Sequence, residues 1–132
     1  MKTRAFYDLV METLEIADRS KGRAITAAVF HALRDRLTAD EARQACAQLP
    51  RPLKRVWNDG DYADRRPLRM HRTQFYTRVR HAALLPSERA ARDATLAVFG
   101  ALKEQLSPGE ADDVLAQLPK DLKEVWTIAQ AP

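Results

Sequence analysis

The sequence AQLPRPLKRVW at residues 47–57 is written almost unchanged a second time, as AQLPKDLKEVW at residues 116–126. The apolar letters are kept, whereas several polar letters differ between the two copies. Proline disfavours helical backbone in the residue before it and is tolerated in the first turn of a helix. Each copy therefore predicts that one helix ends at the leucine and that a short helix starts at the proline. The Leu, Val and Trp that follow are spaced i, i+3 and i+4 and form one apolar face. The motif is predicted to be a joint between helices rather than a site of chemistry.

The similarity extends far beyond this motif. A shift of 69 positions aligns residues 6–57 with residues 75–126 without a gap. The matched pairs include Phe6 with Phe75, Val10 with Val79, Phe30 with Phe99, Leu37 with Leu106, Glu41 with Glu110, and Trp57 with Trp126. Such self-similarity at a fixed offset indicates an internal repeat.

Each copy predicts four helices from its apolar periodicity and from its start signals. The predicted helices cover 4–18, 21–37, 38–49 and 50–57 in the first copy, and 73–85, 88–106, 107–118 and 119–126 in the second. Hydroxyl residues stand at the starts as candidate N-caps: Thr3, Ser20, Thr38, Thr73, Ser87 and Ser107. Thr38 with Glu41, and Ser107 with Glu110, fit a capping box, in which the hydroxyl and the carboxylate each accept from a backbone amide of the other residue.

We therefore predict an all-α fold in which two four-helix units pack as one compact bundle. The single domain spans 1–132, with the first repeat at 1–57, a basic linker at 58–72 and the second repeat at 73–132. One copy alone is too short to bury a comfortable core. We expect the two halves to share a core through the faces that carry Trp57 and Trp126.

Composition places the chain among globular proteins. It has 132 residues, of which 45% are hydrophobic and 30% are charged, with 4 glycines and a single cysteine. Cys46 rules out an internal disulfide and fits a reducing compartment. The N-terminal apolar stretch is interrupted by Asp8, Glu12 and Glu15, so neither a signal peptide nor a membrane span is expected. We expect a cytoplasmic protein.

Several stretches resemble domain-of-unknown-function family 2267, an uncharacterised bacterial family. They are LRDRLTADEA at 33–42, the two AQLP stretches, RMHRTQF at 69–75 and LSPGEADDVLAQLPKDLKEVW at 106–126. The resemblance covers nearly the whole chain. It implies no catalytic residue and no activity.

The most informative feature outside the repeat is charge. Residues 51–81 hold nine basic and three acidic side chains, whereas residues 82–132 hold five basic and eight acidic ones. Free amides at a helix N-terminus, together with nearby guanidinium groups, can bind an anion. The candidate residues for an anion or a partner are Arg65, Arg66, Arg69, His71, Arg72 and Thr73. The other interpretation is a solvated linker that pairs with the acidic second half of its own chain.

Nucleic-acid binding is weighed on the same residues. The sequence pI of about 9.5 favours it, but the C-terminal third is acidic and no helix-turn-helix recognition helix follows either proline joint. Phe75 and Tyr76 have counterparts at Phe6 and Tyr7 and are expected in the core. Only Tyr62 stands free to stack on a base.

No catalytic, metal or cofactor site is expected. Cys46 takes the position of Leu115 in the other copy, which predicts a core slot. His31, His71 and His81 lack metal-ligand spacing. Asp59, Asp61 and Asp64 lack the closing glutamate of a calcium loop and predict a polar turn.

These observations favour a non-enzymatic interaction or regulatory protein that binds a protein partner or itself, without a membrane role. The alternative is an anion or nucleic-acid binder that uses the Arg-rich connector at 51–81.

Overall fold

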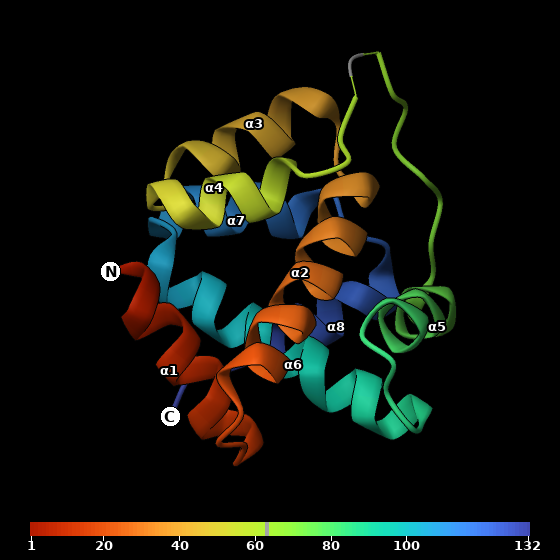
Figure 1. Cartoon of the computed structure of the whole chain (residues 1–132). Helices are drawn as coiled ribbons and strands as arrows, with labels where there is room; N and C mark the ends of the chain where they lie inside the picture. Colours follow the sequence, from red (N-terminus) through yellow and green to blue (C-terminus); the bar gives the residue numbers. More distant parts are fainter. Residues whose placement is uncertain (63) are drawn as a thin grey trace.

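The structure, a computed structural model, describes residues 1–62 and 64–132, which form eight α-helices (Figure 1). The helices are α1 (Thr3–Leu14), α2 (Arg19–Arg36), α3 (Ala39–Ala47), α4 (Arg51–Asn58), α5 (Arg72–Ala82), α6 (Glu88–Gln105), α7 (Pro108–Ala116) and α8 (Lys120–Ile128). No strand occurs in these two ranges, so the predicted all-α fold is confirmed. None of the helices described is both long and apolar enough to cross a membrane.

The two longest helices, α2 and α6, contact each other and form the centre of the molecule. Helix α1 packs on both of them, and so does α5. Each outer helix therefore contacts one central helix from its own half of the chain and one from the other half. The two halves share one hydrophobic core, as predicted from their short length.

A row of aromatic side chains runs through each half. The ring centroids of Phe6 and Phe30 lie 5.6 Å apart, and those of Phe30 and Trp57 lie 5.3 Å apart. In the second half the corresponding spacings are 5.7 Å from Phe75 to Phe99 and 5.0 Å from Phe99 to Trp126. All six side chains are buried, and their tilted or edge-on geometries are those that aromatic pairs prefer.

The expectation that the tryptophan-bearing faces join the two halves is wrong. Helix α4 packs on α2 and α3, and α8 packs on α6 and α7, so each tryptophan faces its own half. The main contacts between the halves come from α1 with α6, α2 with α5, α2 with α6, and α3 with α7. The short α4 and α8 instead cover the outer ends of the two aromatic rows.

The proline joints form where they were predicted. Pro50 and Pro119 are the N-cap residues of α4 and α8, so each helix starts one residue later than predicted. The carbonyls of the two prolines accept from the amides of Lys54 and Lys123. At the other end of each short helix, a basic side chain of the central helix satisfies the terminal carbonyls. Arg34 donates to the carbonyl of Trp57 at 2.7 Å, and Lys103 donates to that of Trp126 at 2.8 Å. These bonds attach the ends of α4 and α8 to α2 and α6.

Several predicted helix boundaries need correction. Helix α1 ends at Leu14 instead of residue 18, because Glu15 adopts a left-handed conformation with φ of 54° and terminates the helix. Leu84 has the same φ just after α5, which ends at Ala82 instead of residue 85. Lys2, Asp18 and His71, rather than Thr3, Ser20 and Thr73, are the N-cap residues of α1, α2 and α5.

Gly100 lies in the middle of α6, where alanine would ordinarily improve helix propensity. A Cβ atom at this position would lie 2.7 Å from the backbone carbon of Gln130 and 2.9 Å from the nitrogen of Ala131. Glycine at position 100 therefore allows the C-terminal segment to cross α6 in direct contact with its backbone. In the first half the same position is His31, whose Nε2 lies 2.6 Å from the carbonyl of Val56.

We predict that Gly100→Ala lowers the free energy of unfolding by about 1–3 kcal/mol, because backbone rather than a flexible side chain must move. Gly109→Ala is the matched control, since no atom lies within 4 Å of its Cβ position. It should leave stability unchanged or raise it by up to about 1 kcal/mol. Urea denaturation followed by circular dichroism measures both, and equal effects of the two substitutions would contradict the assigned role of Gly100.

Candidate functional site

Residues 65–68 of the connector between α4 and α5 are held against α2. The amide of Leu68 donates to the carbonyl of Asp35 at 2.7 Å, and the guanidinium of Arg65 donates to the carbonyl of Leu37 at 2.9 Å. The side chain of Met70 is buried. These contacts determine which basic groups of the connector face solvent.

Arg65, one of the predicted binding residues, is used to hold the fold together. It is buried, and its Nε donates to Asp61 at 2.7 Å. Its guanidinium anchors the connector to the C-terminal end of α2, where the carbonyl of Leu37 would otherwise be unpaired. Arg65 is therefore not available on the surface for a partner.

Asp35 connects α2, the connector and α5. Its carboxylate accepts from Arg34 at 2.8 Å and also from Arg78 of α5, and its carbonyl accepts from Leu68. Burial by itself would raise the pKa of Asp35, but the hydrogen bonds from Arg34 and Arg78 outweigh it and lower the pKa. The carboxylate is thus held ionised between two arginines.

The N-terminus of α5 already has a carboxylate partner. Asp121, from the first turn of α8, accepts from the backbone amide of Arg72 at 2.9 Å and lies 3.8 Å from Nδ1 of His71. Gln74 accepts from the amide of His71 at 2.8 Å. Thr73 is exposed but does not cap the helix. An anion approaching this end would therefore compete with Asp121.

We use the name basic surface for five basic side chains, three on α4 and two on the connector. Arg51, Lys54 and Arg55 lie along α4 at i, i+3 and i+4, and Arg66 and Arg69 are exposed on the connector. None of the five forms an ion pair within residues 1–62 and 64–132. Four of them are exposed, and Lys54 is half-buried.

A groove lies next to the basic surface, between α3 and α4. Its cavity volume is about 560 Å³, and its lining includes Arg43, Cys46, Lys54, Trp57, Asn58 and Tyr62. Tyr62 is 71% exposed at the start of the connector. The groove therefore combines apolar and aromatic side chains with two basic ones and one acidic one, Asp61.

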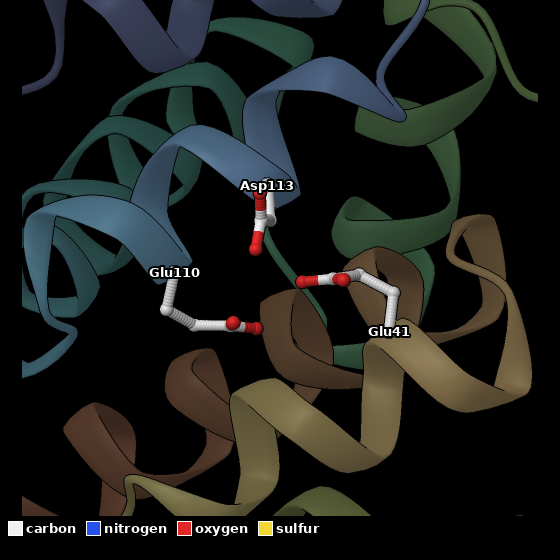
Figure 2. A group of neighbouring side chains, drawn as sticks. All are labelled: Glu41, Glu110 and Asp113. Atoms are coloured by element: carbon white, nitrogen blue, oxygen red, sulfur yellow. The ribbon is translucent and has the colours of Figure 1, made fainter.

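A second cluster of side chains lies between α3 and α7 (Figure 2). Glu41 of α3 and Glu110 of α7 point toward one another, and Asp113 of α7 points toward the same space. One carboxylate oxygen from each residue lies within 4.8 Å of those of the other two. Both glutamates are only 7% exposed, whereas Asp113 is exposed.

Glutamines from the opposite half explain why the two glutamates are free to converge. The hydroxyls of Thr38 and Ser107 cap α3 and α7 as predicted, accepting from the amides of Glu41 and Glu110. The return bonds of the predicted capping boxes come from other residues. Gln117 accepts from the amide of Thr38 at 2.9 Å, and Gln48 accepts from that of Ser107 at 2.7 Å.

Burial raises the pKa of Glu41 to about 8, and hydrogen bonding and repulsion from Glu110, with repulsion from Asp113, add to the effect. Neither glutamate forms an ion pair with a basic side chain among the residues described. Two buried carboxylates this close cannot both be ionised without compensation. A proton shared between the two carboxylates, or a bound cation, can supply this compensation.

Comparison with known proteins identifies the family. A family model described as "Uncharacterized conserved protein (DUF2267)" matches residues 3–125. The chain belongs to this family. No match was found among curated proteins. The resemblance seen in the sequence is therefore confirmed, and the family description names no activity.

The other residues of this DUF2267 chain that were weighed as catalytic or metal-binding candidates lie as follows. Cys46 is buried in the core, as predicted, and burial raises the pKa of its thiol, which keeps it in the unreactive protonated form. His31 contacts the carbonyl of Val56. Asp61 pairs with Arg65, and Asp59 and Asp64 are exposed.

Sequence reasoning missed the glutamate cluster because both glutamates fit a capping box. A signal was nevertheless present, since Glu41 and Glu110 align with each other when the sequence is shifted by 69 positions. If two copies face each other, a residue near the contact can meet its own counterpart. Residue spacing alone does not reveal that α3 and α7 make this contact.

We predict that Glu41→Gln makes the stability of the DUF2267 protein less dependent on pH. The pKa of Glu41 is about 8 in the folded chain against 4.5 as the ordinary value, so its proton stabilises the fold at low pH and is lost as pH rises toward 8. In EDTA the variant should match the wild type near pH 5. Near pH 9 it should exceed the wild type by about 1–3 kcal/mol, because no buried charge is formed.

Urea denaturation at a series of pH values tests this prediction. Glu104→Gln, an exposed glutamate on α6, is the control and should follow the wild type throughout. Parallel curves for the wild type and for Glu41→Gln would show that the pair does not retain a proton in the folded state.

Proposed function

We propose that this DUF2267 protein is a non-enzymatic interaction protein that binds an acidic segment of a protein partner. The observation that supports the proposal is the basic surface, whose five cationic side chains have no ion-pair partner within the chain as described. Charge complementarity across an interface speeds association and selects among partners. An acidic segment is the class of partner that matches this surface.

The neighbouring groove supports a peptide-like segment rather than a single ion. Its lining holds Trp57 and Tyr62 as well as Lys54, so apolar and acidic side chains of one segment could be accommodated together. Aromatic and arginine side chains are enriched where proteins bind each other. A second copy of this chain is included among such partners, because residues 82–132 carry an acidic excess.

Nucleic acid is the second candidate partner, and the exposed Tyr62 favours it. A tyrosine that is 71% exposed could stack on a base while Lys54 of the same groove and the arginines of the connector contact phosphates. The single exposed ring and the acidic second half of the chain favour the protein partner over this alternative.

We also propose that the fold arose from two copies of one four-helix unit, and that the protein acts in the bacterial cytoplasm. The matched lengths of α2 and α6, at 18 residues each, and of α3 and α7, at 9 residues each, support the first proposal. The single buried, free cysteine and the family resemblance support the second.

The first prediction from this function concerns capture of a partner from the native host. The wild type should enrich one acidic protein reproducibly in pull-downs read by mass spectrometry. A variant with Arg51, Lys54, Arg66 and Arg69 changed to Ala should lose it by tenfold or more. The control changes Arg89, Arg92, Lys120 and Lys123 to Ala, which removes the same charge from exposed positions elsewhere and should retain the partner.

A second prediction separates the alternatives. The protein partner predicts no gel shift of single- or double-stranded nucleic acid at ~100 mM salt. A shift that weakens steeply with salt and disappears in the first variant but not in the control would favour nucleic-acid binding instead. Light scattering identifies self-association if the captured partner is a second copy. Equal loss of partner in both variants would argue against the basic surface as the binding site.

A further inference from the structure

We propose that Glu41, Glu110 and Asp113 form a binding site for one divalent cation of the hard, oxygen-preferring class, such as Ca²⁺, Mg²⁺ or Mn²⁺. The site lies between α3 and α7 and so joins the two halves of the chain (Figure 2). It is separate from the basic surface and does not depend on the function proposed for that surface.

The carboxylates of the three residues converge on one point. Three carboxylates from two helices point into one space, with one oxygen of each within 4.8 Å of the others. The oxygens around one Ca²⁺ lie about 2.3–2.6 Å from the ion, so two of them are at most about 5 Å apart. The observed spacing fits ligands of one ion.

The two glutamates each have a buried carboxylate oxygen without a hydrogen-bond donor from another residue. Oε1 of Glu41 and Oε1 of Glu110 are both inaccessible to solvent, and each side chain is only 7% exposed. Without a proton shared between the two carboxylates, neither oxygen has a hydrogen-bond donor within the described chain. Buried polar atoms are almost always satisfied, so a buried oxygen without a donor calls for a proton, a water molecule or an ion as its partner. Here the two oxygens belong to glutamates that face each other.

The chemistry of the ligand atoms selects the class of metal ion. All three ligands are carboxylates, which suit hard cations and not the softer metals that favour thiolate or imidazole. Glu41 and Glu110 lie in the first turns of α3 and α7, where the helix N-terminus favours a carboxylate in its ionised form. Asp113 is exposed, so water can reach the site and complete the coordination shell.

Bound there, the cation would neutralise the repulsion between the two glutamates and link α3 to α7. The four hydrogen bonds that Gln48 and Gln117 exchange with Ser107 and Thr38 already join the N-terminal end of each helix to the C-terminal end of the other. The ion would thus act on the contact that connects the two halves.

Thermal unfolding of the full chain tests the proposal. Protein treated with EDTA and exchanged into metal-free buffer at pH 8 is titrated with CaCl₂, MgCl₂ or MnCl₂, and NaCl at equal ionic strength serves as the blank. At least one ion should raise Tm by several degrees in a saturable manner, because a ligand that binds only the folded state stabilises it. Glu41→Gln and Glu110→Gln should each abolish the shift.

Matched controls are available on the same helices. Asp40→Asn on α3 and Asp112→Asn on α7 remove exposed carboxylates outside the cluster and should leave the metal-induced shift unchanged. Electron paramagnetic resonance of Mn²⁺ gives a second readout that is independent of stability. It should report about one bound ion per wild-type chain and none for Glu41→Gln.

Three outcomes would overturn the proposal. One is the absence of any Tm shift with all three ions at millimolar concentration, together with no bound Mn²⁺. Another is a shift that persists in both glutamine variants. The third is a Tm that responds to pH through Glu41 but to no cation, which would show that a shared proton alone compensates the pair.

Discussion

The packing of α1 on α6 and of α5 on α2 is the contact on which the rest of this structure depends. Each outer helix is amphipathic and short, and a half chain of this size cannot bury a sufficient core by itself. Because each half completes the core of the other, the two aromatic rows lie within one hydrophobic interior. The short helices α3, α4, α7 and α8 are then placed by the ends of the central helices, with Arg34 and Lys103 binding the terminal carbonyls of α4 and α8.

This mutual arrangement brings like residues of the two halves together. Gln48 and Gln117 each complete the cap of a helix in the opposite half, a task that the sequence pattern attributes to Glu41 and Glu110. The glutamates are thereby released from a local role and meet between α3 and α7 (Figure 2). The result is a buried group of carboxylates without a basic partner among the described residues, which requires a proton or a cation for compensation.

Some basic residues of the Arg-rich connector bind other parts of the chain, and others have side chains that face solvent. Arg65 satisfies a carbonyl at the end of α2, Arg78 neutralises Asp35, and Asp121 meets the amide of Arg72. Within residues 1–62 and 64–132, the guanidinium groups of Arg66, Arg69 and Arg72 and the basic side chains of α4 form no ion pair. The charge excess counted along the sequence is therefore larger than the charge that a partner would meet on the basic surface.

The sequence by itself determined the features that depend on neighbouring residues. Proline predicted the joints at Leu49 and Leu118, and hydroxyls predicted the caps of α3, α6 and α7. Apolar spacing predicted the core face that holds Leu53 and Trp57. The early end of α1 at Leu14 was not predicted, because the left-handed residue that follows it is a glutamate instead of a glycine. Only the tertiary structure decided that Glu41 faces Glu110, that Arg65 is buried and that Asp121 occupies the start of α5. Each of these is a contact between groups on different elements, and Glu41 and Glu110 lie in opposite halves of the chain. Their energies come from burial and charge at short distance, which the order of residues along the chain does not specify.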